Sequence, residues 1–516
     1  MTLPPEASNA PEHWSPARLS EIAEVRLGRQ RSPDRATGVS PCPYLRAANL
    51  TWRGFDLTDI KVMDFSPDER RTFRLEPGDI LLNEASGSPS EVGKAAVWSG
   101  QIPLVCFQNT LIRVRAPECL VPFLLWRFQH DALLGHFAAA SRGVGIHHLG
   151  AAALQDWEVS LPPLGEQLRI VASLKAHFTR LDEAEAALER AEATLESLRA
   201  SILQAAVEGR LVPTEAELAR RERRSYEPAT VLLDRILAER RKRWEASGRR
   251  GKYEAPVLPD TSSLPDLPEG WAIAPLGAIA EVEGGIAKSP DRVERKGLRP
   301  VAYLRVANVQ RGYLDLNEVK LIYATEAEIA ALGLQPGDVL LNEGGDRDKL
   351  GRGWIWRGEI GECIHQNHVF RARLCGNELA PQFVSWYANT AGIGYFTREG
   401  RQTTNLASIS LSTLRALPVA LPPAAEQRRI VEEVERRTAE AGSVGEALAG
   451  ASVRVRALRS SILRLAFSGG LVDPEPSDGP ASALLERIRA ERAREGAAAG
   501  RKSIGRRVRR PRSKTA

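Results

Sequence analysis

Cysteine is sparse and unpatterned in this 516-residue chain. The five cysteines are odd in number and include no CxxC pair: Cys42, Cys106, Cys119, Cys363 and Cys375. Disulfide-rich secreted domains and cysteine zinc sites both need more regular spacing, so the sequence argues against either class. A reducing cytoplasm is therefore the expected compartment.

Membrane and export signals are also missing. No apolar run approaches the length of a membrane span. The first residues, MTLPPEASNAPEHW, lack the basic start and apolar core of a signal peptide. Aromatic residues make up only 6% of the chain, but the hydrophobic fraction of 43% is enough to fill ordinary cores. The length suits two or three domains.

Positive charge is concentrated at the carboxyl end. Residues 501–516 (RKSIGRRVRRPRSKTA) hold eight Lys or Arg and no acid, so the total of +6 leaves −2 for the rest of the chain. The folded part is not globally basic, and an interpretation as a nucleic-acid binder must rest on local patches. The tail is predicted to be disordered, and non-specific attraction to phosphates is the alternative role.

Motifs of self-contained active sites are absent or degraded. The nearest match to a P-loop, Gly87–Ala95, has five residues between its glycines and an alanine where a hydroxyl must meet magnesium. No GxGxxG, HExxH or GxSxG motif supports a dinucleotide, zinc-protease or hydrolase site. The adjacent His147 and His148 diverge on a regular element and cannot chelate one ion together. We therefore expect neither a catalytic residue nor a metal site.

What the chain does contain is a tandem duplication with a period of about 260 residues. LPPLGEQLRIV (161–171) and SILQAAVEGRLVP (201–213) return as LPPAAEQRRIV (421–431) and SILRLAFSGGLV (461–472). Between these motifs each copy keeps an apolar heptad, which predicts two long helices that pack along one seam. The heptad positions are Leu174, Leu181, Leu188, Leu195 and Ile202, and Val434, Ala441, Leu448, Val455 and Ile462. A second seam is assigned to Ala184, Ala191, Leu198 and Ala205, and to Val444, Ala451, Leu458 and Leu465.

The segments before the long helices are duplicated as well. PYLRAANL and PGDILLNEASG in the first copy correspond to AYLRVANV and PGDVLLNEGG in the second. Short strand-like runs broken by Gly and Pro turns, with one main helical pattern, predict an α+β domain in each copy. VLLDRILAERRKRW (231–244) predicts a basic helix ahead of a Pro-rich linker, and ALLERIRAER (483–492) partly repeats it.

The fold class is therefore α+β, with two similar globular domains held apart by a pair of long helices that form a coiled coil. The expected boundaries are 1–163 for the first domain and 164–213 for the first helix. They continue with 214–270 for the basic helix and linker and 271–423 for the second domain. The last segments are 424–472 for the second helix and 473–516 for a short helix and the basic tail.

Each domain offers polar side chains in the turns between strands, of the types that read base edges in the major groove. The candidates in the first domain are Arg46, Arg53, Lys94, Gln108, Asn109, Arg142, His147 and His148. In the second they are Arg305, Arg311, Arg352, His365, Gln366, Asn367, Arg401, Gln402, Thr403 and Asn405. Solvated or capping polar residues are the alternative. A buried structural amide network explains the repeated Gln-Asn pairs at least as well as DNA does, whereas the Gly-rich loops differ between copies and suit specificity better.

The duplicated pattern resembles the specificity subunit of type I restriction–modification systems over about residues 14–473. The motifs that carry the resemblance are LPPLGEQLRIV and LPPAAEQRRIV, the two SIL closings, the two LLNE runs, and YLRAANL with YLRVANV. The resemblance implies two target-recognition domains, each reading one half of a bipartite site in double-stranded DNA. It implies a spacer of two antiparallel helices that docks two methyltransferase subunits, which in turn recruit restriction and motor subunits. S-adenosylmethionine, ATP and magnesium are then used by the partners and not by this chain.

Two other functions stay open at this point. A DNA methyltransferase or nuclease with its own recognition domains would need a cofactor or metal motif, and the sequence offers none. A coiled-coil scaffold without a DNA role is the third hypothesis.

Overall fold

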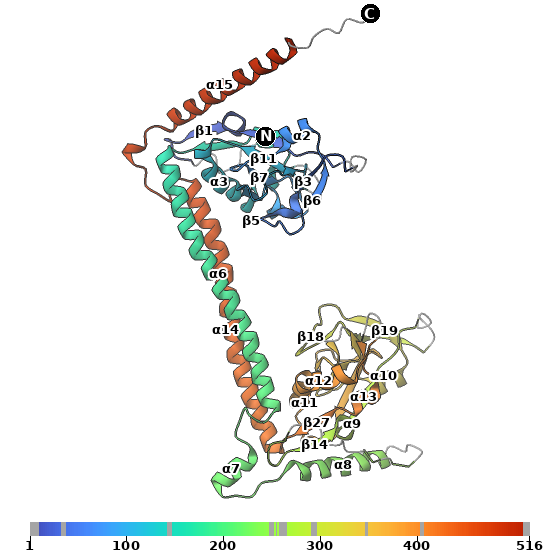
Figure 1. The fold of residues 1–516 in the computed structure, drawn as a ribbon. Coiled ribbons are helices and arrows are strands. Elements are labelled where there is room, and N and C mark those ends of the chain that lie inside the picture. Colours follow the sequence, from blue (N-terminus) through green and yellow to red (C-terminus); the bar gives the residue numbers. More distant parts are fainter. Residues whose placement is uncertain are drawn as a thin grey trace, which may run out of the picture. The chain divides into compact units, whose positions relative to one another are not determined.

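The computed structural model describes residues 10–31, 38–141, 147–246, 252–253, 255–256, 266–289, 297–345, 349–402 and 407–508. The chain divides into two compact units, Met1–Glu189 with Ala449–Ala516, and Arg190–Leu448 (Figure 1). Each unit holds one globular domain and one portion of each long helix. The predicted α+β class is confirmed.

Two sheets build the first domain. The four-stranded antiparallel sheet has the order β2 (Glu24–Leu27), β11 (Leu111–Arg115), β7 (Ile80–Asn83) and β9 (Ala95–Val97). The three-stranded sheet has the order β10 (Cys106–Phe107), β3 (Pro41–Leu45) and β6 (Lys61–Asp64), with β10 parallel to β3. All four residues of β7 are buried: Ile80 and Leu82 share a core with α3 (Val121–Leu133) and α4 (His136–Ala140), and Leu81 packs with Trp98 and Phe107 in a second core.

The second domain repeats this topology strand for strand. Its four-stranded sheet has the order β15 (Ala280–Gly284), β24 (Val369–Leu374), β20 (Val339–Asn342) and β22 (Gly353–Ile355). Its three-stranded sheet has the order β19 (Lys320–Ala324), β16 (Arg299–Leu304) and β23 (Cys363–His365). The helices α11 (Pro381–Asn389) and α12 (Ala391–Glu399) correspond to α3 and α4. The duplication expected from the sequence is thus present in the fold.

The first and last strands of each domain pair with each other. β1 (Ser15–Arg18) is antiparallel to β13 (Glu158–Leu161), and β14 (Ala272–Pro275) is antiparallel to β27 (Pro418–Leu421). Each domain is therefore closed immediately before its long helix begins.

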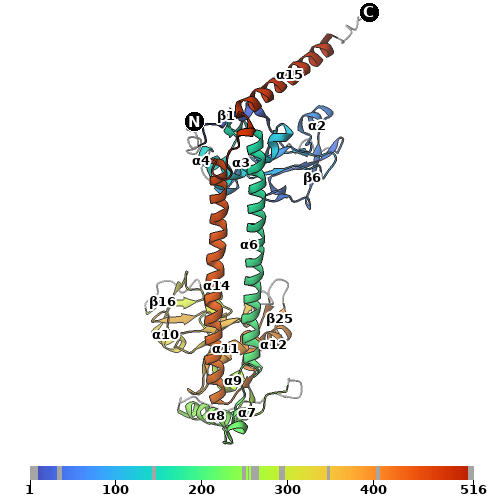
Figure 2. The same cartoon turned by 90° about the vertical axis from the view of Figure 1, so that its left-hand side faces the viewer.

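The long helices are α6 (Leu164–Val207) and α14 (Ala424–Phe467), each of 44 residues. In the first unit Leu174 and Phe178 of α6 share a core with Leu463 of α14, and in the second Ile202 shares a core with Val434. The beginning of each helix therefore packs against the end of the other, and the pairing is antiparallel (Figures 1 and 2). Among the described residues, no helix is long and apolar enough to cross a membrane.

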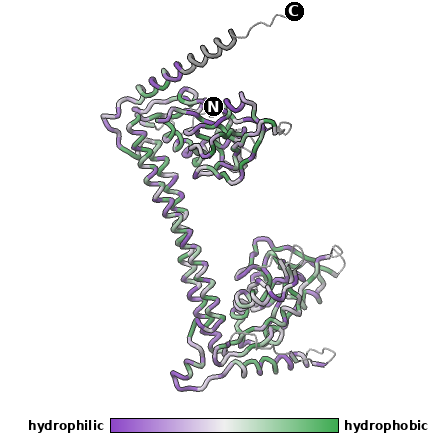
Figure 3. Tube along the Cα trace, in the orientation of Figure 1, coloured by the Kyte–Doolittle hydropathy of each residue, from purple (hydrophilic) through white to green (hydrophobic). Residues whose placement is uncertain are grey.

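The heptad predicted as the main seam packs inward, but the second seam was placed one residue too early. Leu198, Val444, Leu458 and Leu465 are about half exposed, at 51%, 49%, 50% and 47%. The residues four positions after the main heptad take the inner place, as Phe178, Ala206 and Ala466 do. Residues three and four apart share a helix face, so apolar content alone did not separate the two choices. Polar and apolar residues alternate along both helices (Figure 3).

Polar side chains also occupy the inner seam. Arg459 contacts Asp182 and Glu185 in the first unit, and Arg199 donates to the carbonyl of Ala441 in the second at 3.1 Å. These long side chains lay their alkyl stems along the seam while their charged ends reach partners. A purely apolar pattern could not have identified these positions.

The repeated opening motif LPPxxEQ joins each domain to its helix. The buried Glu166 accepts a hydrogen bond from the indole of Trp14 at 2.9 Å, and Glu426 accepts one from Trp271 at 2.9 Å. Gln167 donates to the carbonyl of Pro162, and Gln427 donates to that of Pro422. Burial raises the pKa of Glu426, although the hydrogen bonds from the Trp271 indole and the N–H of Glu215 act in the opposite direction. The repetition of this motif thus has a structural cause.

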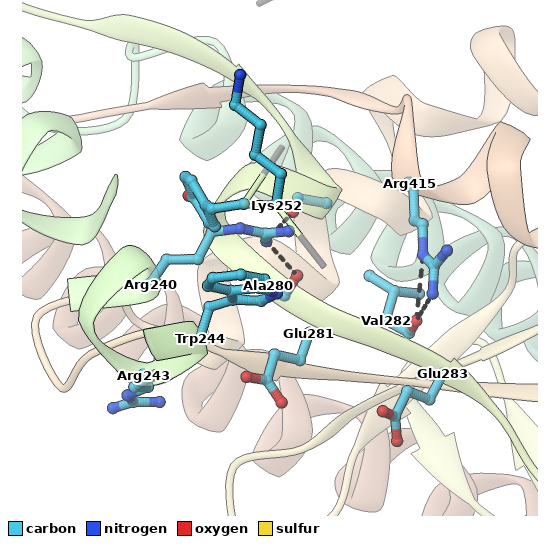
Figure 4. Close-up of a pocket in the computed structure, with 11 residues that line it drawn as sticks. Arg240, Arg243, Trp244, Lys252, Ala280, Glu281, Val282, Glu283 and Arg415 are labelled. Atoms are coloured by element: carbon cyan, nitrogen blue, oxygen red, sulfur yellow. Dashed lines mark hydrogen bonds between the residues drawn. The ribbon is translucent and has the colours of Figure 1, made fainter. Parts of the chain in front are cut away.

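Each unit carries an appended helix on the outside of its domain. α8 (Ala229–Ala246) and α15 (Ala481–Val508) pack apolar faces that include Leu232 and Leu484. Arg240 donates to the carbonyl of Gly277 and Arg492 donates to that of Ser20 (Figure 4 shows Arg240). The predicted helices 231–244 and 483–492 lie within these elements. α7 (Glu215–Glu222) was not predicted, and residues 501–508, expected to be disordered, continue α15. Residues 509–516 lie outside the described part.

Gly209→Ala is expected to lower the free energy of unfolding by about 1–2 kcal/mol, because this glycine ends α6 with a φ of +70°. An added Cβ would also lie 2.9 Å from the Trp271 ring. The matched control is Gly442→Ala inside α14, where nothing lies within 4 Å of the added atom. That change should stabilise the chain by about 0.5–1 kcal/mol. Thermal unfolding of both variants measures the two effects, and equal changes in their unfolding temperatures would contradict the prediction.

Candidate nucleic-acid interface

Three loops of the first domain meet at one end of the four-stranded sheet. They follow β7 (84–94), join β10 to β11 (108–110) and precede α5 (Ala151–Gln155), where the described part is 147–150. The short strands β8 (Ala85–Ser86) and β12 (His147–His148) pair the first loop with the third. Glu84 ties all three, because its N–H donates to the carbonyl of Thr110 and its carbonyl accepts from the N–H of Leu149.

The second domain gathers the same loops around Glu343. Its N–H donates to the carbonyl of His368 at 2.9 Å, and its carbonyl accepts from the N–H of Ile409 at 2.8 Å. β21 (Gly344–Gly345), β26 (Ala407–Ser408) and β25 (Arg401–Gln402) form a small sheet here. The described ends of the Gly-rich loops that sequence reasoning favoured for specificity, at Leu149 and Ile409, therefore bond to equivalent glutamates in the two copies.

A histidine faces the central glutamate in both domains, but from different loops. Nδ1 of His148 lies 3.2 Å from Glu84, and Nδ1 of His368 lies 2.5 Å from Glu343. His147 instead lies 2.9 Å from the hydroxyl of Ser141. The two edges thus share a carboxylate and differ in the groups around it. Sequence reasoning missed Glu84, Glu343 and His368, although the repeated LLNE run marked both glutamates.

Several candidate contacts are engaged within the chain. Lys94 is 12% exposed and forms an ion pair with Glu91. Arg352 reaches the carbonyl of Val306 at 3.5 Å, and Arg311 donates to the carbonyl of Asn389. The exposed Arg53 lies 3.9 Å from Asp182 and Glu185. Their spacing in sequence gave no sign of these partners, because most lie far away along the chain.

His365 is the clearest correction among the candidates. It is fully buried, and its Nδ1 lies 2.6 Å from the carbonyl of Val369. Burial lowers the pKa of His365 to about 4, so the ring is neutral at pH 7 and faces the domain interior. It cannot contact a base while the domain is folded.

The buried amide network exists, but not at the Gln-Asn pairs. Gln108, Asn109, Gln366 and Asn367 are only half-buried. The buried amides belong to the other repeated motifs. They are Asn49 and Asn308 of the YLRxAN runs and Asn83 and Asn342 of the LLNE runs. Asn49 bonds the carbonyls of Asp56 and Asp59, and Asn308 bonds those of Asp315 and Glu318. These motifs repeat because they hold the loop between two strands.

Three candidates, Arg142, Thr403 and Asn405, lie outside the described residues. Arg401 is exposed on β25, beside Gln402. Both stand on the strand that pairs with β26, so they belong to the same edge as Glu343.

Two other polar sites do not resemble a cofactor site. His130, Asp131 and His136 bring their ligand atoms within 4.8 Å of one another. The Asp131 oxygens already accept from Arg127, Trp157 and both imidazoles, so this cluster is a buried ion-pair network. A cavity of about 380 Å³ lies beside α8 (Figure 4). Its Arg240 donates to the carbonyls of Gly277 and Ala280 and holds α8 to the domain, whereas its Arg415 donates to the carbonyl of Val282.

Comparison with known proteins agrees with this architecture. A family model described as the type I restriction modification DNA specificity domain matches residues 11–192. The chain is 25% identical over 507 residues to the type I restriction enzyme EcoKI specificity subunit of Escherichia coli, covering 95% of this chain and 98% of that protein. It is 26% identical over 509 residues to the StySPI specificity subunit of Salmonella potsdam, covering 94% and 97%.

The fold has a counterpart among solved structures. A chain from a structure that concerns the assembly and conformational transition of the type I R-M system aligns with a TM-score of 0.59 at 18% identity. The alignment covers 89% of this chain and 99% of that one. Residues 11–192 thus match the type I restriction modification DNA specificity domain, and nearly the whole chain is similar in sequence to type I restriction enzyme specificity subunits.

Proposed function

We propose that this chain is the non-catalytic DNA-recognition subunit of a type I restriction–modification complex, and that each α+β domain reads one half of a bipartite site. The observation that carries the proposal is the pair of equivalent loop edges around Glu84 and Glu343. The two copies share one scaffold and present different loop sequences, as two readers of different half-sites would. Major-groove readout needs such protruding donor and acceptor groups on a rigid support.

The helix pair formed by α6 and α14 has two roles in this proposal. At 1.5 Å per residue, 44 residues span about 66 Å, or nearly two turns of B-DNA. A rod of that length sets an unread gap between the half-sites. Its exposed apolar residues, among them Leu198 and Leu458, offer a docking surface for two methyltransferase subunits.

The remaining chemistry belongs to the partners. The methyltransferase subunits would use S-adenosylmethionine, and restriction and motor subunits recruited through them would use ATP and magnesium. Among the described residues, the side chains of the two central glutamates, Glu84 and Glu343, contact the imidazoles of His148 and His368. An enzyme with its own recognition domains is less well supported, and a scaffold without DNA gives no reason for the two loop edges.

The test is co-expression with the methyltransferase subunit of the same type I system in a host that lacks other DNA methylation. Single-molecule sequencing of the host DNA then gives the methylated motif. The expected result is two short half-sites around a fixed gap. A contiguous motif would contradict the two-reader geometry, and a soluble complex without methylation would favour the scaffold.

A further inference from the structure

A second feature of the first domain lies next to its loop edge. A cavity of about 450 Å³ lies against β3 and β6, which pair side by side in one sheet. Its lining includes Arg31, Tyr44, Arg46, Lys61, Gln108 and Thr110. Tyr44 is opposite Lys61 in the β3–β6 register, and Thr110 is the residue whose carbonyl binds the N–H of Glu84. The cavity therefore adjoins the proposed reading edge.

The second domain places equivalent side chains at the same points of its sheet. Tyr303 is opposite Lys320 in the β16–β19 register, as Tyr44 is opposite Lys61. Ile286 bridges to Gln366 as Arg29 bridges to Gln108, which makes Lys288 the counterpart of Arg31. Arg305 follows β16 as Arg46 follows β3. Each domain thus holds three cations around a buried tyrosine.

The charge balance is the same in both copies. Arg46 and Lys61 contact one acid, Asp59, at 2.5 and 2.7 Å, and hydrogen bonding from Lys61 lowers the pKa of Asp59. Arg305 and Lys320 contact one acid, Glu318, at 3.6 and 3.5 Å. With Arg31 or Lys288 included, the described residues of each group are three cations and one acid, a net charge of +2.

Folding alone does not require these cations. The loop after β3 or β16 is already held by the buried Asn49 or Asn308. Lys61 and Lys320 are each 53% exposed, and Arg31 and Lys288 are exposed too. Arg31 and Lys288 also share charge but not residue type. A neutral polar residue would serve as well at positions that only needed to be solvated.

The repetition indicates what kind of group these cations meet. Two domains that read different half-sites should differ where they touch bases. Phosphates are the same in every DNA sequence, so positions kept in both copies suit contact with the backbone. We propose that in each domain this cationic group binds a backbone phosphate of the DNA, next to the half-site that the domain reads. This inference rests on the proposed function, and it separates the positioning residues from those that confer specificity.

The experiment uses the full chain in complex with its methyltransferase. One variant combines Arg31→Gln with Lys61→Gln, and the other combines Lys288→Gln with Lys320→Gln. Arg46 and Arg305 are left intact because they also contact their own loops. The control is Arg357→Gln, an exposed arginine just after Ile355. Ile355 pairs with Val339 at the start of β20, at the opposite end of the sheet from Glu343.

Binding to the methylated motif and to unrelated duplex DNA is measured across a range of salt concentrations. Each double variant should lose about tenfold in affinity for both DNAs. The slope of log affinity against log salt should become shallower by about one for each lost phosphate contact. For Arg357→Gln, neither the affinity nor the salt slope should change. The methylated motif found by sequencing should stay the same for both double variants and for the control.

Two results would overturn the phosphate assignment. An altered motif, or a loss of affinity only for the methylated site, would mean that these side chains contact bases. An unchanged affinity and salt slope would mean that they contact no DNA. Failure of the proposed function looks different, because the unmodified complex would then yield no split motif.

Discussion

Asp131→Asn should lower the free energy of unfolding of the first unit by about 3–5 kcal/mol. Asp131 is fully buried and its Oδ2 accepts from Arg127 at 2.9 Å and from the indole of Trp157 at 2.8 Å. Its Oδ1 lies within hydrogen-bond distance of His130 and His136. The amide keeps the volume but removes the carboxylate that pairs with Arg127, which is 3% exposed. A buried guanidinium without a counter-charge is costly.

The control for this prediction is Asp156→Asn, the same chemical change at an exposed position of the same domain. Calorimetry of the full-length chain measures both. The control should leave every transition in place, while Asp131→Asn should lower the transition of the first unit alone. A loss of under 1 kcal/mol would show that water or a rearranged partner compensates Arg127.

The same carboxylate sets a pH dependence. Burial alone would raise the pKa of Asp131, but the Arg127 charge and the hydrogen bonds from both histidines outweigh it and hold the pKa well below its usual range. The folded pKa is thus below the unfolded value of about 3.9. The stabilisation is complete above that value and is lost as the pH falls toward the folded pKa. The contribution of this group should therefore not change between pH 6 and 8.

The internal repeat was the most informative signal in the sequence. Most of the repeated residues hold the fold together, and few of them are candidate DNA contacts. Glu166 and Glu426 repeat because each receives a tryptophan indole, and Asn49 and Asn308 repeat because each closes a loop. The heptad from Leu174 to Ile202 was predicted because apolar spacing follows directly from helix geometry. The second seam was not, because residues three and four apart both lie near the interface.

The candidate contacts were harder to predict for a physical reason. Whether an arginine is available depends on partners that the fold brings close, such as Asp59 for Arg46, thirteen residues away. Residue type alone did not separate the buried His365 from the exposed His368, three positions later. The two cationic groups could be recognised as equivalent only from the strand register, which places Lys61 opposite Tyr44 and Lys320 opposite Tyr303.

Four residues inserted into each long helix should widen the unread gap of the methylated motif by one to two base pairs. The insertions belong between Leu188 and Glu189 in α6 and between Ser452 and Val453 in α14. Both sites lie between the contact of Asp182 with Arg459 and that of Arg199 with Ala441. Four helical residues add about 6 Å and a right-handed rotation of about 40°. One base pair adds about 3.4 Å and about 35° in the same sense, so the displaced reader still meets a groove.

A seven-residue insertion at the same sites is the matched control, because it preserves the heptad but not the phase with DNA. It adds about 10.5 Å with almost no net rotation about the seam, whereas three base pairs of B-DNA turn by about 100°. The reader would then face the phosphate backbone instead of the groove. Methylation should fall at least tenfold in this variant while the complex still assembles. If both insertions left the gap unchanged, the helix pair would not be the element that sets it, and the spacing would have to come from the partner subunits.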